Sequence, residues 1–148
     1  MKIAIIGPGA LGCLFAAFLS KKEEVWLLDK NPERAKTIRE QGIKIEGISG
    51  DWQASVKVTA NPKEIGTVDL VVICVKSYDT KEAVKQINDL LSEHTAVLTL
   101  QNGLGNIEII GEQVGAERVL GGVTNQGATL LGYGRIRYAG RGETIIGK

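Results

Sequence analysis

The sequence predicts an α/β fold with a doubly wound, mostly parallel sheet and antiparallel strands at its carboxyl-terminal end. Apolar runs of strand length alternate with segments of helix length as far as residue 124. Residues 69–75 are apolar without alternation, which is typical of a parallel strand covered on both faces. The 148 residues are 43% hydrophobic, enough for one core. We therefore expect a single domain over residues 1–148.

The first half of the chain predicts two strand–helix units. The first unit ends in a charged cluster at residues 21–24, and the second strand ends at Asp29. Asn31 and Pro32 form a helix start, and Gly42 stops that helix. The predicted elements are strands over residues 2–6 and 25–28 and helices over residues 10–19 and 32–41.

The middle of the chain predicts a hairpin followed by further strand–helix units. Residues 43–47 and 53–58 alternate apolar and polar side chains around the turn-forming residues 49–51, so they form a hairpin or an edge extension. The apolar run over residues 69–75 is the expected central strand. The remaining predicted elements are a helix over residues 80–91, a strand over 96–100, a helix over 107–114 and a strand over 119–124.

The pattern changes after Gly127. Residues 135–138 and 143–146 are short β-prone segments between glycines, without intervals long enough for helices. They predict an antiparallel finish to the sheet. No repeat, low-complexity tract or Pro- or Ser-rich linker marks an internal boundary.

Composition and charge exclude several function classes. Lysine and arginine number 18 against 17 aspartate and glutamate residues, so no basic field selects nucleic acid or an anionic membrane. The chain reaches Gly7 too soon for a signal-peptide core or a membrane span, which predicts a cytoplasmic protein. Cys13 and Cys74 lie among apolar neighbours and are expected to be reduced core residues, with no metal site. The single histidine, His94, is expected in a solvated loop, which removes the commonest general acid–base.

A glycine-rich turn follows the first strand and opens the first helix. Gly7 permits the tight turn, Gly9 allows backbone to approach a pyrophosphate, and Gly12 allows close helix–strand packing. The positive end of the helix dipole would face the phosphates. This position predicts a dinucleotide site of the Rossmann type. The turn matches G-x-G-x-x-G with residues Gly7, Pro8, Gly9, Ala10, Leu11 and Gly12.

The residues after the second strand give conflicting signals about the cofactor. Asp29 stands where an acid hydrogen-bonds the adenine-ribose hydroxyls of NAD, although it could also be a solvated strand-end carboxylate. Lys30 and Arg34 suit the 2′-phosphate of NADP, although Arg34 could equally be an exposed helix charge. The residues alone therefore do not decide between NAD and NADP.

Later segments carry a resemblance to a known family, together with the glycine turn. They are Val75-Lys76-Ser77-Tyr78, Gln101-Asn102-Gly103-Leu104-Gly105-Asn106, Gly121-Gly122-Val123-Thr124, Gly127-Ala128, Gly134-Arg135-Ile136, Gly140-Arg141-Gly142 and Ile145-Ile146-Gly147. With these segments the chain resembles the ketopantoate reductases over its entire length. Members of this family reduce 2-dehydropantoate to pantoate on the route to pantothenate and coenzyme A.

The resemblance implies roles for individual residues. Lys76 and Asn102 would hydrogen-bond the nicotinamide-side ribose, Asn102 would also lie near the substrate, and the Ala128 backbone would contact the cofactor. Lys30 matches a basic position for the 2′-phosphate, so NADP(H) is favoured, while Asp29 keeps NAD(H) possible. The residues themselves support Lys76, because it follows an apolar strand and so falls at the carboxyl edge where α/β sheets bind ligands.

The chain departs from the family pattern at its end. The catalytic lysine and a substrate-binding glutamate of ketopantoate reductases lie in a helical carboxyl-terminal domain, which is expected to be absent here, so no catalytic residue is assigned. We expect the cofactor-binding half of an oxidoreductase with a small-molecule keto-acid substrate. The alternatives are another Rossmann dehydrogenase domain for 2-hydroxy acids or sugar acids, or a non-catalytic NAD(P)-sensing module. An exposed sheet edge would allow the chain to form a homodimer.

Overall fold

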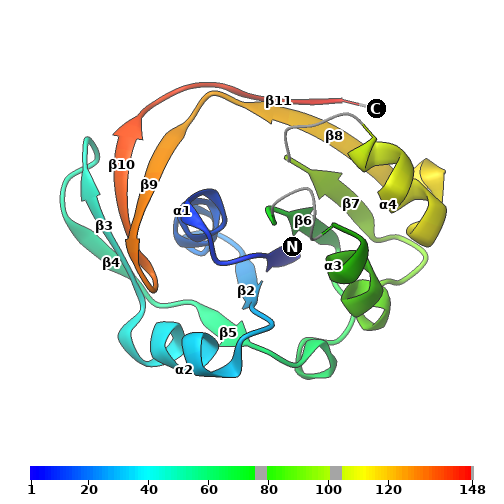
Figure 1. Cartoon of the computed structure of the whole chain (residues 1–148), viewed down its shortest axis with the longest axis horizontal. Coiled ribbons are helices and arrows are strands. Elements are labelled where there is room, and N and C mark those ends of the chain that lie inside the picture. Colours follow the sequence, from blue (N-terminus) through cyan, green and yellow to red (C-terminus); the bar gives the residue numbers. More distant parts are fainter. Residues whose placement is uncertain (76–79, 101–104, 148) are drawn as a thin grey trace.

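Two sheets and four α-helices make up the computed structural model, which describes residues 1–75, 80–100 and 105–147 (Figure 1). The large sheet holds β1 (Lys2–Ile6), β2 (Glu24–Leu28), β5 (Lys57–Thr59), β6 (Leu70–Ile73), β7 (Ala96–Thr99), β8 (Val119–Thr124) and β11 (Thr144–Gly147). The small sheet holds β3 (Ile43–Gly47), β4 (Trp52–Ala54), β9 (Gly127–Gly132) and β10 (Arg135–Gly140). The helices are α1 (Ala10–Leu19), α2 (Pro32–Gln41), α3 (Thr80–Gln86) and α4 (Asn106–Val114).

The large sheet has the order β11-β8-β7-β6-β1-β2-β5, and all its pairs are parallel except β8 with β11. β1 lies between β2 and β6, so the strand order reverses beside it. Ligands bind at such a switch point, outside the carboxyl ends of the strands. The predicted doubly wound sheet with an antiparallel finish is confirmed.

Side chains of β1 alternate between two hydrophobic cores, as the period of a strand requires. Ile3 and Ile5 pack on the side of α1, whereas Ala4 and Ile6 pack on the side of α3 and α4. Helices therefore cover both faces of the large sheet. This two-sided burial explains why the central strands carry unbroken apolar runs.

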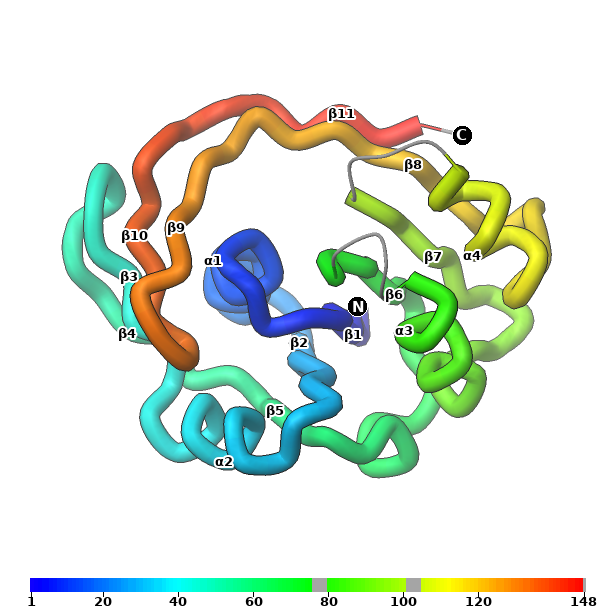
Figure 2. Tube along the Cα trace, viewed as in Figure 1, coloured from blue at the N-terminus to red at the C-terminus, as the bar shows by residue number. Residues whose placement is uncertain are grey.

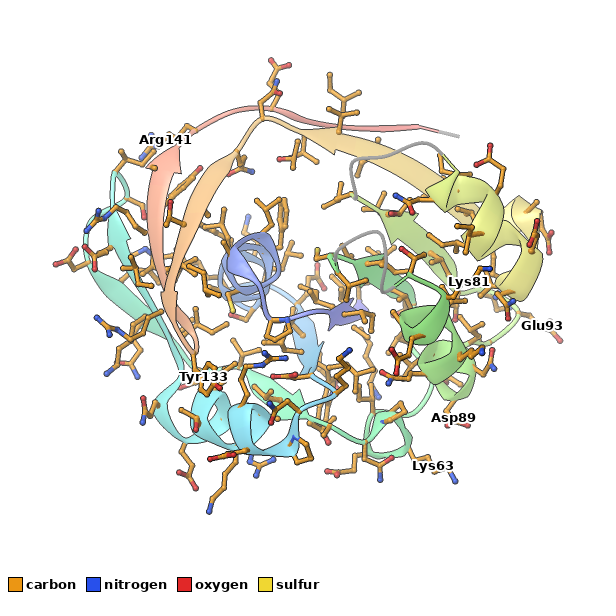
Figure 3. All side chains as sticks on the ribbon, viewed as in Figure 1. Lys63, Lys81, Asp89, Glu93, Tyr133 and Arg141 are labelled. Atoms are coloured by element: carbon orange, nitrogen blue, oxygen red, sulfur yellow. The ribbon has the colours of Figure 1, made fainter. Side chains whose placement is uncertain are left out.

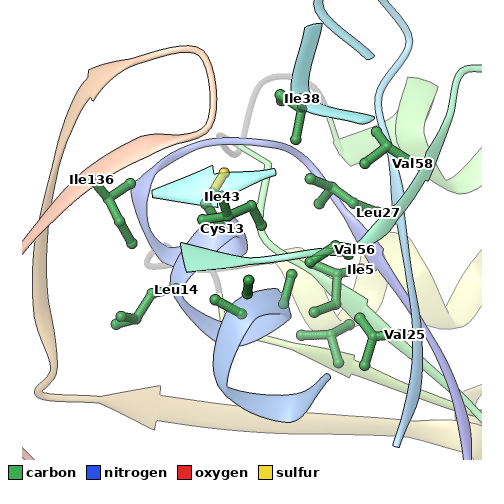
Figure 4. Packing of buried hydrophobic residues seen from close by; sticks show 14 of the residues in the cluster. Ile5, Cys13, Leu14, Val25, Leu27, Ile38, Ile43, Val56, Val58 and Ile136 are labelled. Carbon is green, nitrogen blue, oxygen red and sulfur yellow. The ribbon is translucent and has the colours of Figure 1, made fainter. Parts of the chain in front are cut away.

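The small sheet closes over the outer side of α1. Its order is β4-β3-β10-β9, and β10 pairs parallel with β3 and antiparallel with β9. Phe18 of α1 lies edge-on to Trp52 and Tyr138 of the small sheet, with ring centroids 5.1 and 5.6 Å apart. Figure 4 shows Ile43 and Ile136 of the small sheet in the same cluster as Leu14 of α1. Helix α1 is thus enclosed between two sheets.

One long antiparallel ribbon links the two sheets. Figure 2 shows β8 running on into β9 and β10 into β11, with a bend between them. At the bend the Asn125 amide donates to the Glu143 carbonyl at 2.9 Å, and the hydroxyls of Thr124 and Thr144 are 3.0 Å apart. The ribbon carries the chain from the edge of the large sheet around α1 (Figure 1).

Four details of the predicted elements need correction. The strand predicted over residues 53–58 is two strands in different sheets, β4 and β5. The helix predicted over residues 80–91 is α-helical only to Gln86 and continues as the 3-10 turn Ile87–Leu90. Residues 135–138 pair with β3 and β9 rather than with the large sheet. The strand β9 was not predicted, because its run of Thr, Leu and Leu does not alternate in burial.

The outer edge of the large sheet is apolar. Val123, Ile145 and Ile146 of β8 and β11 are 63%, 63% and 52% exposed. No helix in the described ranges is long and apolar enough to span a membrane.

Candidate functional site

The glycine turn has the geometry that its sequence predicts. Gly7 has φ +106°, a conformation that side chains rarely adopt, and a Cβ there would lie 2.9 Å from Val75 Cγ1. A Cβ on Gly12 would clash with the Gly7 carbonyl oxygen. Both glycines are therefore required by the fold, because they let α1 begin directly against the end of β1.

Gly9 differs from Gly7 and Gly12, because the space that a side chain on Gly9 would occupy is empty in the described part of the chain. Its backbone is extended, with φ −72° and ψ −172°. Among the described residues beyond its chain neighbours, no atom lies within 4 Å of the position a Cβ would take. Within the described chain, no side chain caps this end of α1 and no acid lies in its first turn. The initial N–H groups of the helix thus face a space that an anion can fill.

A cavity of about 320 Å³ opens beside this turn, a volume in the range of small-ligand sites. Gly7, Pro8 and Gly9 form part of its wall, and Asp29 and Lys30 at the end of β2 form another part. The remaining walls come from the end of β6, from α3 and from the β9–β10 hairpin. The cavity therefore lies at the switch point of the large sheet.

Asp29 forms a buried ion pair with Arg34 at the edge of this cavity. The Asp29 side chain is 0% exposed, and Arg34 Nε and Nη2 donate to its Oδ2 and Oδ1, each at 2.6 Å. The backbone N–H of Asn31 also donates to Asp29 Oδ1, at 3.0 Å. These contacts with Asp29 raise the pKa of the Arg34 guanidinium above its ordinary value. The alternative of a solvated Asp29 carboxylate is therefore wrong.

The first turn of α2 places Arg34 opposite Asp29. Asn31 caps the helix by accepting hydrogen bonds from the Glu33 and Arg34 amides, both at 3.1 Å. Pro32 occupies the first turn, as predicted. Because the cap fixes the residue at which α2 begins, it also fixes the position of Arg34 relative to Asp29 at the end of β2.

Lys30 extends from the same loop toward α3. Its Nζ lies 3.8 Å from Glu82 Oε2, and the two side chains are 53% and 66% exposed. An ion pair this exposed contributes little to stability, so the Lys30 ammonium can turn to another anion at small cost.

Of the remaining predicted site residues, three are described by the structure and two are not. Ala10 and Leu11 begin α1 and pack on the core beside the cavity, and Ala128 of β9 also packs on the core, opposite Tyr138. Lys76 and Asn102 lie outside the described residues. Their predicted contacts with a cofactor stay predictions.

Sequence reasoning missed the contribution of the small sheet to the cavity. Leu130, Gly132 and Tyr133 of the β9–β10 hairpin line it, and the Arg34 guanidinium carbon lies 5.9 Å from the centre of the Tyr133 ring. Figure 3 shows Tyr133 beside α2. The signal that could have found it is an exposed aromatic residue between two glycines in a hairpin.

Both cysteines are free. Cys13 is buried, as predicted, whereas Cys74 is only partly buried and lines the cavity; His94 is exposed. Burial raises the pKa of each thiol to about 12. The thiols should therefore stay protonated at pH 8 and resist alkylation by iodoacetamide in the folded chain. Mass spectrometry should find labelling only after unfolding in guanidinium; rapid labelling of Cys74 in the native chain would contradict its placement.

The comparisons with known proteins agree with this geometry. A family model described as ketopantoate reductase PanE/ApbA matches residues 3–148. The 2-dehydropantoate 2-reductase of Halobacterium salinarum is 39% identical, over 100% of this chain and 49% of that protein. The chain spans about half the length of the curated relatives it matches.

Solved structures give the same result. The 2-dehydropantoate 2-reductase of Geobacter metallireducens superposes with a TM-score of 0.92 at 37% identity, covering 100% of this chain and 49% of that one. A D-mandelate dehydrogenase with NADH and anilino(oxo)acetate has a TM-score of 0.91 at 31% identity, covering 99% of this chain and 48% of that one. Because the family model matches nearly all of its residues, this chain belongs to the PanE/ApbA family of ketopantoate reductases.

Proposed function

We propose that the chain is the cofactor-binding half of a 2-dehydropantoate 2-reductase, which reduces a keto acid to pantoate for pantothenate and coenzyme A synthesis. The observation that carries the proposal is the empty side-chain direction of Gly9 in the wall of the cavity. A pyrophosphate fits that space, since it needs close backbone approach and free N–H groups at a helix start.

In this proposal, the residues of the chain bind the dinucleotide and orient it. Reduced nicotinamide, when bound, supplies hydride to the keto carbon. The glycine turn would hold the pyrophosphate, and the end of β2 would hold the adenine ribose. Lys76 and Asn102 follow β6 and β7 in the sequence, and we propose that they hydrogen-bond the nicotinamide-side ribose, with Asn102 also near the substrate. The Ala128 backbone is proposed as a further cofactor contact.

Dinucleotide binding tests this proposal directly. Titration calorimetry on the 148-residue chain should show one site for NADPH and for NADH. Absence of binding by either dinucleotide would overturn the proposal.

A second candidate is a dehydrogenase for another 2-hydroxy acid. The likeness to a D-mandelate dehydrogenase favours it, since mandelate is an aromatic 2-hydroxy acid. The reading frame that encodes the chain, expressed to its natural stop codon, should reduce ketopantoate faster than phenylglyoxylate if the first proposal holds. Reduction of neither acid, with tight dinucleotide binding, would favour an NAD(P)-sensing module.

The preferred cofactor in this proposal is NADP(H), with NAD(H) as a weaker alternative. Lys30→Ala should weaken NADPH binding more than NADH binding, because the exposed ion pair with Glu82 is weak and a 2′-phosphate can compete with it for the Lys30 ammonium. Fluorescence titration of both dinucleotides measures the difference. Lys63→Ala is the control, because Lys63 is exposed and lies outside the cavity (Figure 3). Equal losses for both cofactors would show that Lys30 does not contact the 2′-phosphate.

A further inference from the structure

The Asp29–Arg34 pair changes what the end of β2 can recognise. An acid at this position serves a free ribose hydroxyl when its oxygens are available. Here both carboxylate oxygens accept from Arg34 at 2.6 Å, and the side chain is fully buried. The charge that would repel a 2′-phosphate is therefore neutralised by its own neighbour.

Arg34 keeps donor capacity toward the cavity while it holds Asp29. A guanidinium carries five N–H donors, and this pair uses one from Nε and one from Nη2. Arg34 lines the same cavity as Lys30, and its side chain is 29% exposed. The planar fork of arginine matches the oxygens of a phosphate.

Two elements fix the orientation of this guanidinium. Asp29 holds one edge from the end of β2, and the Tyr133 ring lies near it from the β9–β10 hairpin, 5.9 Å from the guanidinium carbon. A side chain held in this way loses less freedom on binding than a flexible surface cation does.

The burial of the two cavity cations decides which one contributes more. Lys30 is 53% exposed and faces Glu82, so solvent and a carboxylate screen it, whereas Arg34 is only 29% exposed. Glu82, at 66% exposed, can turn into solvent when a phosphate enters. Arg34 is therefore the less solvated and more firmly held of the two cations, and a phosphate would meet its remaining N–H groups in a fixed orientation.

We propose that Arg34 is the main specificity-determining residue for a 2′-phosphorylated dinucleotide in this cavity, with Asp29 as the residue that positions it. The inference rests on the proposed dinucleotide site and names the side chain that distinguishes its two cofactors. It makes the acid at the end of β2 a support for NADP recognition rather than a mark of NAD recognition.

The test compares NADPH and NADH, which differ only in the 2′-phosphate, by titration calorimetry on the 148-residue chain. Arg34→Gln should raise the Kd for NADPH roughly 10- to 100-fold, the loss expected for one or two charge-assisted hydrogen bonds. The Kd for NADH should change by less than about 3-fold, because NADH has no 2′-phosphate for Arg34 to contact. Arg34→Lys should restore part of the NADPH affinity through its charge alone.

Lys36→Gln is the matched control, since it removes the same charge from an exposed position of α2 outside the cavity. It should leave both affinities unchanged. Because Arg34→Gln leaves a buried carboxylate without its partner, the double variant Asp29→Asn/Arg34→Gln repeats the test with no orphaned charge. Its NADPH affinity should fall as in the single variant.

The outcomes separate this inference from the proposed function. If the parent chain binds neither dinucleotide, both are wrong. If the parent binds them but the ratio of the two Kd values is unchanged in the folded Arg34 variants, the inference about Arg34 alone is wrong.

Discussion

Replacing Gly9 with valine is expected to weaken NADPH and NADH binding by roughly 10²–10⁴-fold, the loss of about two charge-assisted hydrogen bonds to the pyrophosphate. The valine side chain would fill the space that the structure leaves empty at the start of α1. The fold should persist, because the Gly9 backbone is extended and, in the described part of the chain, only its sequence neighbours lie within 4 Å of the new Cβ. Calorimetry measures the affinity, and thermal unfolding checks the fold.

Two further glycines serve as controls for this variant. Gly147→Val places the same side chain in open space on β11, away from the cavity, and should change neither affinity nor stability much. Gly12→Ala should instead destabilise the chain, because its Cβ would clash with the Gly7 carbonyl oxygen. A folded Gly9→Val chain that binds NADPH as tightly as the parent would refute the cofactor site.

The 148-residue chain is expected to bind the dinucleotide without reducing ketopantoate at an enzymatic rate. Hydride delivery leaves negative charge on the carbonyl oxygen, and a positioned acid contributes about 10²–10⁴-fold. The family resemblance places that acid, a lysine, in a carboxyl-terminal domain, and this chain spans about half the length of its curated relatives. Substrate positioning, which the same domain would complete, contributes further orders of magnitude.

A coupled measurement tests this expectation. Cofactor binding is followed by fluorescence, and NADPH oxidation is then followed by the loss of the absorbance of reduced nicotinamide with ketopantoate present. Binding without turnover is the expected result. Robust turnover would show that a residue of this chain, with Lys76 as the first to test by Lys76→Ala, acts as the acid.

The large sheet could be predicted from the sequence because its signals are local. The strands β1, β2, β6 and β7 are largely apolar runs, and α2 has clear start and stop residues in Asn31 and Gly42. The glycine turn was likewise predictable, because the spacing of Gly7, Gly9 and Gly12 states the backbone geometry directly.

The small sheet could not be predicted in the same way, because its pairing is not local. Nothing near Ile45 indicates that its partner is Ile136, and nothing near residues 53–58 shows that the chain changes sheets there. The Asp29–Arg34 pair could not be predicted for the same reason. Its two residues are visible in the sequence, but their burial depends on packing beneath α2 and beside the β9–β10 hairpin.

The parallel pairing of β3 with β10 joins two parts of the chain that are far apart in the sequence. Strands β1 and β2 and helix α1 form from neighbouring residues, whereas Ile45 must wait for Ile136, near the far end of the chain. Contacts between such distant residues form slowly, because closing the intervening loop costs entropy before any contact forms. On a ribosome, β3 and β4 therefore emerge long before β10, the strand that pairs with β3. The hairpin that carries Tyr133 is synthesised after the other elements that line the cavity, so the cavity is complete only once β9 and β10 have emerged.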